Sequence, residues 1–209
     1  GLLLQTACQQ GLQRIRDGVA RLRSQAGRRQ VVVTTTPGLA SLWLIPRLSG
    51  FTRRHPGVDV RLDAVFARRD LDADGIDLAI RYCPQSAAPD GALRLFRETV
   101  APVAHPSLGV RSLDTADALA GQPLLEFEDQ RRPSLQWSEW LRAMGWGHVK
   151  PKSVLRFNQY DQLIQAAVAG QGIALGRLEL IEPMIADGRL AIIATPLRNS
   201  GVEFAYWLL

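Results

Sequence analysis

The chain has 209 residues, of which 46% are hydrophobic and 22% are charged, a balance typical of a folded globular protein rather than a disordered or fibrous one. This length predicts one domain or two small lobes, and no apolar run approaches the ~20 residues of a transmembrane helix. The net charge of +5 is almost entirely arginine and is scattered along the chain, so it permits an anionic partner without establishing one.

The N-terminal segment is predicted to be an amphipathic helix that ends near Gly27. Its apolar residues follow the alternating spacing of a heptad pattern; they are Cys8, Leu12, Ile15, Val19 and Leu22. This stripe either packs on the chain's own domain or pairs with a second subunit, and its place at a chain end favours dimerisation through Leu12, Ile15, Val19 and Leu22. Because no helix start signal precedes Gly1, we expect the natural chain to continue upstream.

From residue 30 onward, strand and helix patterns alternate. The β-branched run 30–35 predicts a buried parallel strand, and Pro37 opens an amphipathic helix that reaches about residue 52. Pro46 predicts a kink in this helix or a helix that begins nearer Pro46. A strand, a short helix and another strand follow at 58–65, 68–74 and 76–82. This order predicts a doubly wound parallel sheet.

The second half repeats the alternation and predicts a second lobe. The extended stretch 93–104 is too long for a strand of one small lobe, so we expect it to leave one lobe and enter the other. A helix at 114–119 is expected, with Ser112 or Asp114 as its N-cap. Further strands are predicted at 124–127, 152–157, 172–175, 190–193 and 203–209, and helices at 134–144, 160–169 and 178–186. The fold class is therefore α/β, with two doubly wound, Rossmann-like lobes.

Motifs for enzymatic chemistry are absent from the sequence, which contains no GxSxG, Walker, GxGxxG or HExxH pattern. The two cysteines and three histidines have neither metal-site spacing nor the arrangement of a disulfide framework, and they fit a reducing cytosol. No histidine lies near Cys83 in the sequence, so a nucleophilic role is not supported. We expect no catalytic residues, no metal and no cofactor.

Polar residues gather where the predicted strands end, which is where ligands bind in open α/β sheets. The hydroxyls of residues 34–36 suit a small polar or anionic ligand, or they simply cap the following helix. An arginine at the end of the third strand is able to fork onto a ligand carboxylate or to form an ion pair. The candidates from these strand ends are Thr35, Thr36, Gly38, Arg81, Tyr82, Asn158 and Tyr160.

Three segments carry a family resemblance: TTPGLASLWLIPRLSGFTRRHPGVDVRL, GIDLAIRYCP and AAVAGQGIALGR. They closely resemble the effector-binding domain of LysR-type transcriptional regulators, especially the branch with the glycine-cleavage activator and the β-lactamase regulator. WLIPRL, DLAIRY and AGQGIALGR are specific in this order and spacing, and the resemblance covers essentially the whole chain.

The resemblance implies two lobes of the periplasmic-binding-protein type II architecture, joined by two crossing strands, with an inducer between them. It implies a linker helix at 1–27, one lobe at 28–99 together with 207–209, and a second lobe at 100–206. It also implies that Tyr206 faces the inter-lobe cleft, which adds it to the effector-binding candidates.

Two departures from the family pattern bear on the ligand. Gly38 stands where the family usually has serine or threonine, and Asn158-Gln159-Tyr160 stands where it often has Asp-Ser-Ser. Fewer small hydroxyls and a bulky tyrosine predict a changed ligand or a partly filled pocket.

The resulting hypothesis is an effector-sensing domain of a cytoplasmic transcriptional regulator. A small anionic or amino-acid-like ligand would shift the arrangement of the lobes or of a homo-oligomer, either dimer or tetramer. DNA would be bound only through an N-terminal winged helix-turn-helix that this sequence does not contain, and no membrane partner is expected. The alternative is a stand-alone solute-binding protein or an enzyme on the same two-lobed fold. An upstream signal peptide would favour the alternative, and an upstream helix-turn-helix would favour the regulator.

Overall fold

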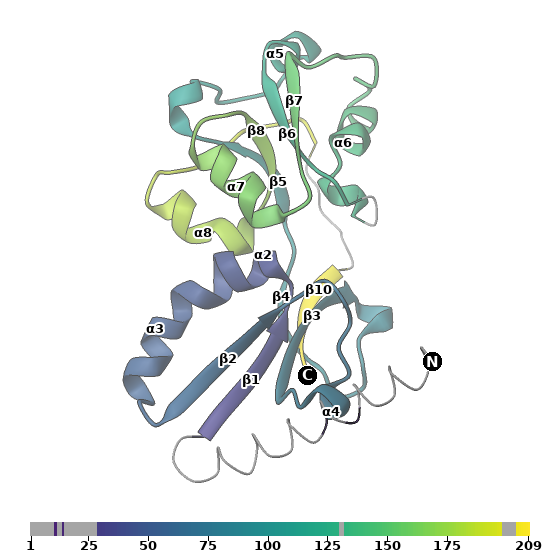
Figure 1. Cartoon of the computed structure of the whole chain (residues 1–209). Coiled ribbons are helices and arrows are strands. Elements are labelled where there is room, and N and C mark those ends of the chain that lie inside the picture. The colour runs from purple at the N-terminus through teal and green to yellow at the C-terminus, as the bar shows by residue number, and fades with distance from the viewer. Residues whose placement is uncertain (1–10, 12–13, 15–28, 130–131, 198–203) are drawn as a thin grey trace.

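The structure, a computed structural model, describes residues 11, 14, 29–129, 132–197 and 204–209. These residues form two lobes, each built around a five-stranded sheet (Figure 1). The predicted pairing residues Leu12, Ile15, Val19 and Leu22 lie outside the described residues.

The first sheet has the strand order β2-β1-β3-β10-β4. Strand β1 runs parallel to β2 and β3, whereas β10 runs antiparallel to β3 and β4. The strands are β1 (Arg29–Thr35), β2 (Val58–Ala64), β3 (Leu78–Pro84), β4 (Leu93–Arg97) and β10 (Phe204–Leu208). The β-branched composition of β1 suits its position between two neighbours, and β2 at the edge alternates half-buried and exposed residues over most of its length.

The second sheet repeats this plan with the order β7-β6-β8-β5-β9. Strand β6 is parallel to β7 and β8, and β5 is antiparallel to β8 and β9. The strands are β5 (Val100–Ala104), β6 (Pro123–Phe127), β7 (Ser153–Phe157), β8 (Ile173–Arg177) and β9 (Ala191–Ile192). The prediction that the stretch 93–104 passes from one lobe to the other is confirmed, because β4 and β5 belong to different sheets.

The first long helix runs without a break, but its backbone hydrogen-bonding pattern changes from α to π and back to α along its length. It comprises α2 (Pro37–Leu39), a π-helical segment η1 (Ala40–Leu44) and α3 (Ile45–Arg54). The N–H of Ile45 bonds to the carbonyl of Ala40, five residues earlier. This wider turn comes directly before Pro46, which has no N–H to donate, so the helix continues past the proline.

The remaining helices are α4 (Leu71–Asp74), α5 (Ala116–Ala120), α6 (Trp137–Ala143), α7 (Tyr160–Val168) and α8 (Leu178–Ala186). The expected N-cap of α5 is wrong: Thr115 caps it, its hydroxyl accepting from the Ala118 N–H at 3.2 Å. The Ser112 hydroxyl instead donates to the Asp114 carboxylate at 2.5 Å. The two predicted capping side chains thus bond to each other and not to the first turn of α5.

The glycines of the AGQGIALGR segment bring β8 close to its neighbours. A Cβ on Gly172 would lie 2.7 Å from the carbonyl oxygen of Pro123, and one on Gly176 would lie 2.7 Å from Val103. Gly170 adopts a positive φ of 73° in the turn after α7. This packing fixes the position of Arg177, the last residue of β8.

The lobes meet where α2 packs against α7 and where η1 packs against α8, at the junction between the lobes in Figure 1. Leu39 of α2 is fully buried and belongs to the same hydrophobic cluster as Leu163 and Ile164 of α7. The start of α2 therefore lies directly beside the second lobe.

Candidate functional site

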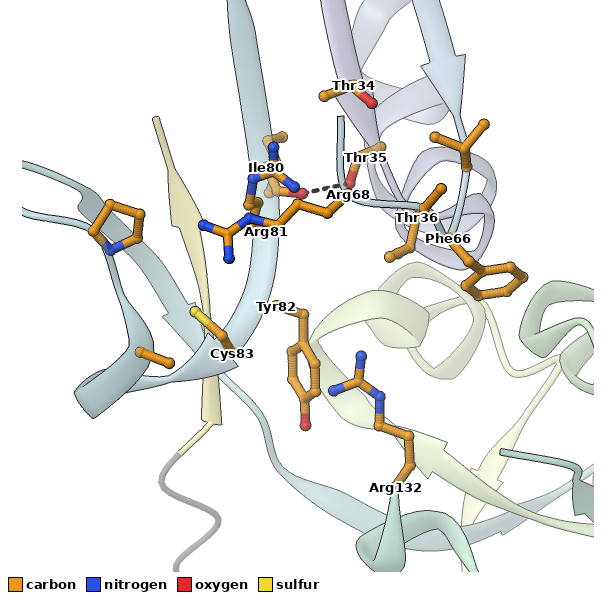
Figure 2. Close-up of a pocket in the computed structure, with 14 residues that line it drawn as sticks. Thr34, Thr35, Thr36, Phe66, Arg68, Ile80, Arg81, Tyr82, Cys83 and Arg132 are labelled. Carbon is orange, nitrogen blue, oxygen red and sulfur yellow. Dashed lines mark hydrogen bonds between the residues drawn. The ribbon is translucent and has the colours of Figure 1, made fainter. Parts of the chain in front are cut away.

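A pocket of about 220 Å³ lies at the carboxyl ends of β1, β2 and β3 (Figure 2). Most of its wall comes from the first lobe, and Arg132, which follows β6, contributes from the second. The lining residues are Thr34, Thr35, Thr36, Val65, Phe66, Ala67, Arg68, Ile80, Arg81, Tyr82, Cys83, Ala87, Pro89 and Arg132. This is the sheet edge at which the sequence predicted a ligand.

The three threonines of this wall differ in what their hydroxyls do. Thr34 donates to the carbonyl of Asp63, and Thr35 donates to the carbonyl of Ile80, both at 3.0 Å. Thr36 is the N-cap residue of α2 by position, yet its side chain makes no capping hydrogen bond. The two buried hydroxyls of Thr34 and Thr35 are therefore structural, whereas the Thr36 hydroxyl does not cap its helix.

Arginines dominate the charge of the pocket, and none of its lining residues is acidic. Arg68 and Arg81 lie next to each other, and Arg132 lies beside the ring of Tyr82, 4.2 Å from its centroid (Figure 2). Arg81 donates through Nη2 to the carbonyl of Arg69 at 2.6 Å, and its Nε finds no hydrogen-bond partner among the described residues.

The pKa values of two pocket arginines are lowered by burial and by neighbouring positive charges. Burial, and then the neighbouring charge of Arg68, lower the pKa of Arg81. Burial and the charge of Arg177 lower the pKa of Arg132, whose Nε lies 3.8 Å from a carboxylate oxygen of Asp129. A negative charge bound in the pocket would favour the charged form of both guanidinium groups and so raise both pKa values.

Behind the pocket, a buried ion pair joins the two lobes. Glu98, between β4 and β5, forms an ion pair with Arg177 of β8, with 2.8 Å between Oε1 and Nε. Both residues are only 6% exposed. The hydroxyl of Tyr82 donates to the other Glu98 oxygen, and Arg177 Nη1 donates to the Tyr206 hydroxyl at 3.0 Å. Burial raises the pKa of Tyr206 to about 12, so this hydroxyl is neutral at physiological pH.

Tyr160, at the start of α7, completes the contact between the lobes. Its hydroxyl accepts from the Arg177 N–H at 2.6 Å and donates to the Leu175 carbonyl at 3.2 Å. Its ring lies against Gly38, where a Cβ would come within 3.3 Å of the tyrosine Cβ. Tyr160 is buried and is not part of the pocket wall.

The predicted site residues thus fall into three groups. Thr35, Thr36, Arg81 and Tyr82 line the pocket. Gly38, Tyr160 and Tyr206 are buried at the lobe contact, and Asn158 is exposed and not part of the pocket wall.

Sequence reasoning missed Arg68, Glu98, Arg132 and Arg177. Arg177 ends a strand, so the rule that selected Arg81 could have found it. Arg132 lies in a loop and Glu98 within an extended stretch, and neither position carries a signal of burial or of charge pairing.

Across the described ranges, no helix is both long and apolar enough to span a membrane. Within those same ranges, no three histidine, cysteine, aspartate or glutamate side chains gather closely enough to hold a metal ion.

Comparison with known proteins places these features in a family. A family model described as the LysR substrate binding domain matches residues 24–209. The glycine cleavage system transcriptional activator of Escherichia coli (strain K12) is 32% identical over 176 residues, which are 83% of this chain and 56% of that protein. The HTH-type transcriptional activator AmpR of Rhodobacter capsulatus is 31% identical over 179 residues, 84% of this chain and 60% of that protein.

The X-ray structure of the effector domain of AmpR from Pseudomonas aeruginosa is similar in fold, with a TM-score of 0.60 and 28% identity. The match covers 87% of this chain and 84% of that domain. The chain spans little more than half the length of the curated relatives that it matches. The expected two-lobed α/β fold is confirmed, and the chain belongs to the LysR family as its substrate-binding domain.

Proposed function

We propose that this chain is the effector-sensing part of a cytoplasmic, DNA-binding transcriptional regulator, and that a small organic anion in the arginine-lined pocket is its effector. The single observation that carries the ligand class is a pocket walled by Arg68, Arg81 and Arg132 without a lining carboxylate. The regulatory role is supported by relatives that are named transcriptional activators. The protein acts without catalysis, as a homo-oligomer, and reaches DNA through an N-terminal winged helix-turn-helix outside this chain.

The mechanism is a population shift between lobe arrangements. Arg68 and Arg81 belong to the first lobe and Arg132 to the second, so an anion that contacts all three draws them together. Moving Arg132 closer to Arg68 and Arg81 brings like charges together, so this arrangement is disfavoured while the pocket is empty. A bound anion offsets the repulsion between the arginines only in the arrangement that brings them together. The anion therefore stabilises that arrangement over the other, as a conformational switch requires.

Binding of succinate tests the proposal, with the uncharged succinamide as the control ligand. We expect succinate to raise the melting temperature of the wild type and succinamide to leave it unchanged. Arg81→Met should weaken the affinity for succinate roughly 10- to 100-fold, because hydrogen bonds to charged groups contribute about 1.5–3 kcal/mol each. Arg142→Met, which removes the same charge from an exposed position on α6, is the matched control.

Cys83 provides a second readout because its side chain lines the pocket. Burial raises the pKa of its thiol above the usual value, so its alkylation by iodoacetamide should be slow. Bound succinate should slow the alkylation of Cys83 further, as measured by peptide mass spectrometry. Equal alkylation rates with and without saturating succinate would place the anion elsewhere.

A further inference from the structure

The space between the first turns of α2 and α7 is filled by a side chain of the protein itself. Tyr160 is 2% exposed, and its ring atoms Cδ1 and Cγ lie 3.4 and 3.7 Å from the position that a Gly38 Cβ would occupy. The absence of a side chain at Gly38 is what admits the ring. Glycine on one lobe and tyrosine on the other thus form a matched pair across the lobe contact.

Tyr160 is fixed in this position from several sides. Its hydroxyl satisfies two buried backbone groups, the Arg177 N–H and the Leu175 carbonyl. Its ring packs edge-on against Phe127 at 5.6 Å, and the Arg177 guanidinium lies 4.7 Å from its centroid. Rotation of the ring out of the contact would leave both backbone groups unpaired in a buried environment, which is costly.

The arginine-lined pocket and the Gly38–Tyr160 pair lie close together along α2. Thr36 lines the pocket, and Gly38, two residues later on α2, contacts Tyr160 instead. The pocket volume of about 220 Å³ is below the ~300–1,000 Å³ typical of sites for drug-sized ligands. Neither Gly38 nor Tyr160 is part of the pocket wall, so the space that their contact fills lies beyond the pocket, next to Thr36 along α2.

We infer that Tyr160 is the specificity-determining residue of this pocket: it closes the space between α2 and α7 and so limits the effector to a short anion. This inference rests on the proposed function, because it concerns the size of the ligand that the arginines bind. A smaller residue at this position would extend the pocket past Thr36 along the lobe contact.

Calorimetric titration with dicarboxylates of increasing length tests the inference. The wild type should bind malonate and succinate and should bind the longer suberate at least about tenfold more weakly than succinate. Tyr160→Ser should reverse or remove this preference, since seating two further methylene groups of suberate in the opened space gains about tenfold in affinity. Tyr160→Phe keeps the ring and should retain the wild-type preference for short diacids.

The outcomes separate the inference from the proposed function. If the wild type binds succinate but Tyr160→Ser shows the same length preference as the wild type, Tyr160 does not set ligand size and the inference fails alone. If no diacid binds the wild type or any variant, the anion-binding function fails and the inference fails with it. Should Tyr160→Ser not fold, Tyr160→Leu opens a smaller space while keeping an apolar side chain, and the same shift toward longer diacids is expected.

Discussion

Replacing Glu98 by glutamine should destabilise the protein far more than the loss of an exposed carboxylate. Glutamine keeps the shape of the side chain but removes the charge that faces Arg177 Nε at 2.8 Å. The arginine side chain is only 7% exposed, so water does not replace the lost counterion. The remaining partners of Arg177, among them the neutral hydroxyl of Tyr206, do not neutralise it.

The expected size of the effect follows from burial. Removing one partner of a buried ion pair costs about 3–5 kcal/mol, because the other charge is left uncompensated. In a domain of this length, 1 kcal/mol corresponds to roughly 2–4 °C, so the melting temperature should fall by roughly 6–20 °C. The exposed pair of Asp187 and Arg189 contributes little by contrast, since its side chains are 48% and 47% exposed and water screens the charges.

Urea and thermal denaturation followed by circular dichroism measure the difference. Asp187→Asn is the matched control for the loss of one carboxylate, and its melting temperature and urea midpoint should be close to those of the wild type. The double variant Glu98→Leu with Arg177→Met removes both charges and should recover most of the loss caused by Glu98→Gln. A Glu98→Gln protein as stable as Asp187→Asn would refute the argument that this pair is buried and coupled.

Three further predictions concern other parts of the molecule. Because burial raises the pKa of Tyr206 to about 12, against ~10 when unfolded, its contribution to stability is complete below pH ~10 and is lost as the pH rises toward 12. Denaturation between pH 8 and 11.5 should therefore show a shallower alkaline decline for Tyr206→Phe than for the wild type, and equal slopes would contradict this. Thr36→Val should weaken succinate binding about fivefold in a titration without lowering the melting temperature, because its hydroxyl makes no capping hydrogen bond; unchanged affinity would show that the hydroxyl does not contact the ligand. If the predicted N-terminal helix pairs two subunits, Ile15→Asp should shift sedimentation toward smaller species, because an unpaired charge in its predicted apolar stripe is costly to bury; an unchanged profile would remove this segment from the interface.

The alternation of strands and helices could be predicted from the sequence because apolar residues recur with a strand or a helix spacing in most segments. The crossing of the stretch 93–104 between lobes could be predicted from its length alone, since one small lobe has no room for a strand of that length. Helix starts were less predictable where several capping residues stand together. Ser112, Asp114 and Thr115 all suit an N-cap, and only the folded structure shows that Ser112 and Asp114 bond to each other while Thr115 caps the helix.

The site could be predicted only where strand ends mark it. Thr36 directly follows β1, and Arg81 lies near the end of the predicted third strand, although β3 continues to Pro84; both residues line the pocket. Whether a threonine hydroxyl is free or bonded depends on a neighbouring carbonyl, as for Thr35 and Ile80, which are 45 residues apart. Arg132 reaches the pocket from another lobe, and no local pattern in the sequence encodes that approach.

The order in which the strands of the two sheets occur along the chain also constrains how the protein folds. Strand β10 lies between β3 and β4, so these two strands are not joined until β10 arrives. The second sheet contains only strands from residues 100–192, all of which are synthesised earlier. During translation the second lobe is therefore able to form all of its strand pairs first. Until β10 is synthesised, the facing edges of β3 and β4 have unpaired backbone N–H and C=O groups. A chain cut before β10 would leave the first lobe unable to join β4 to the rest of its sheet.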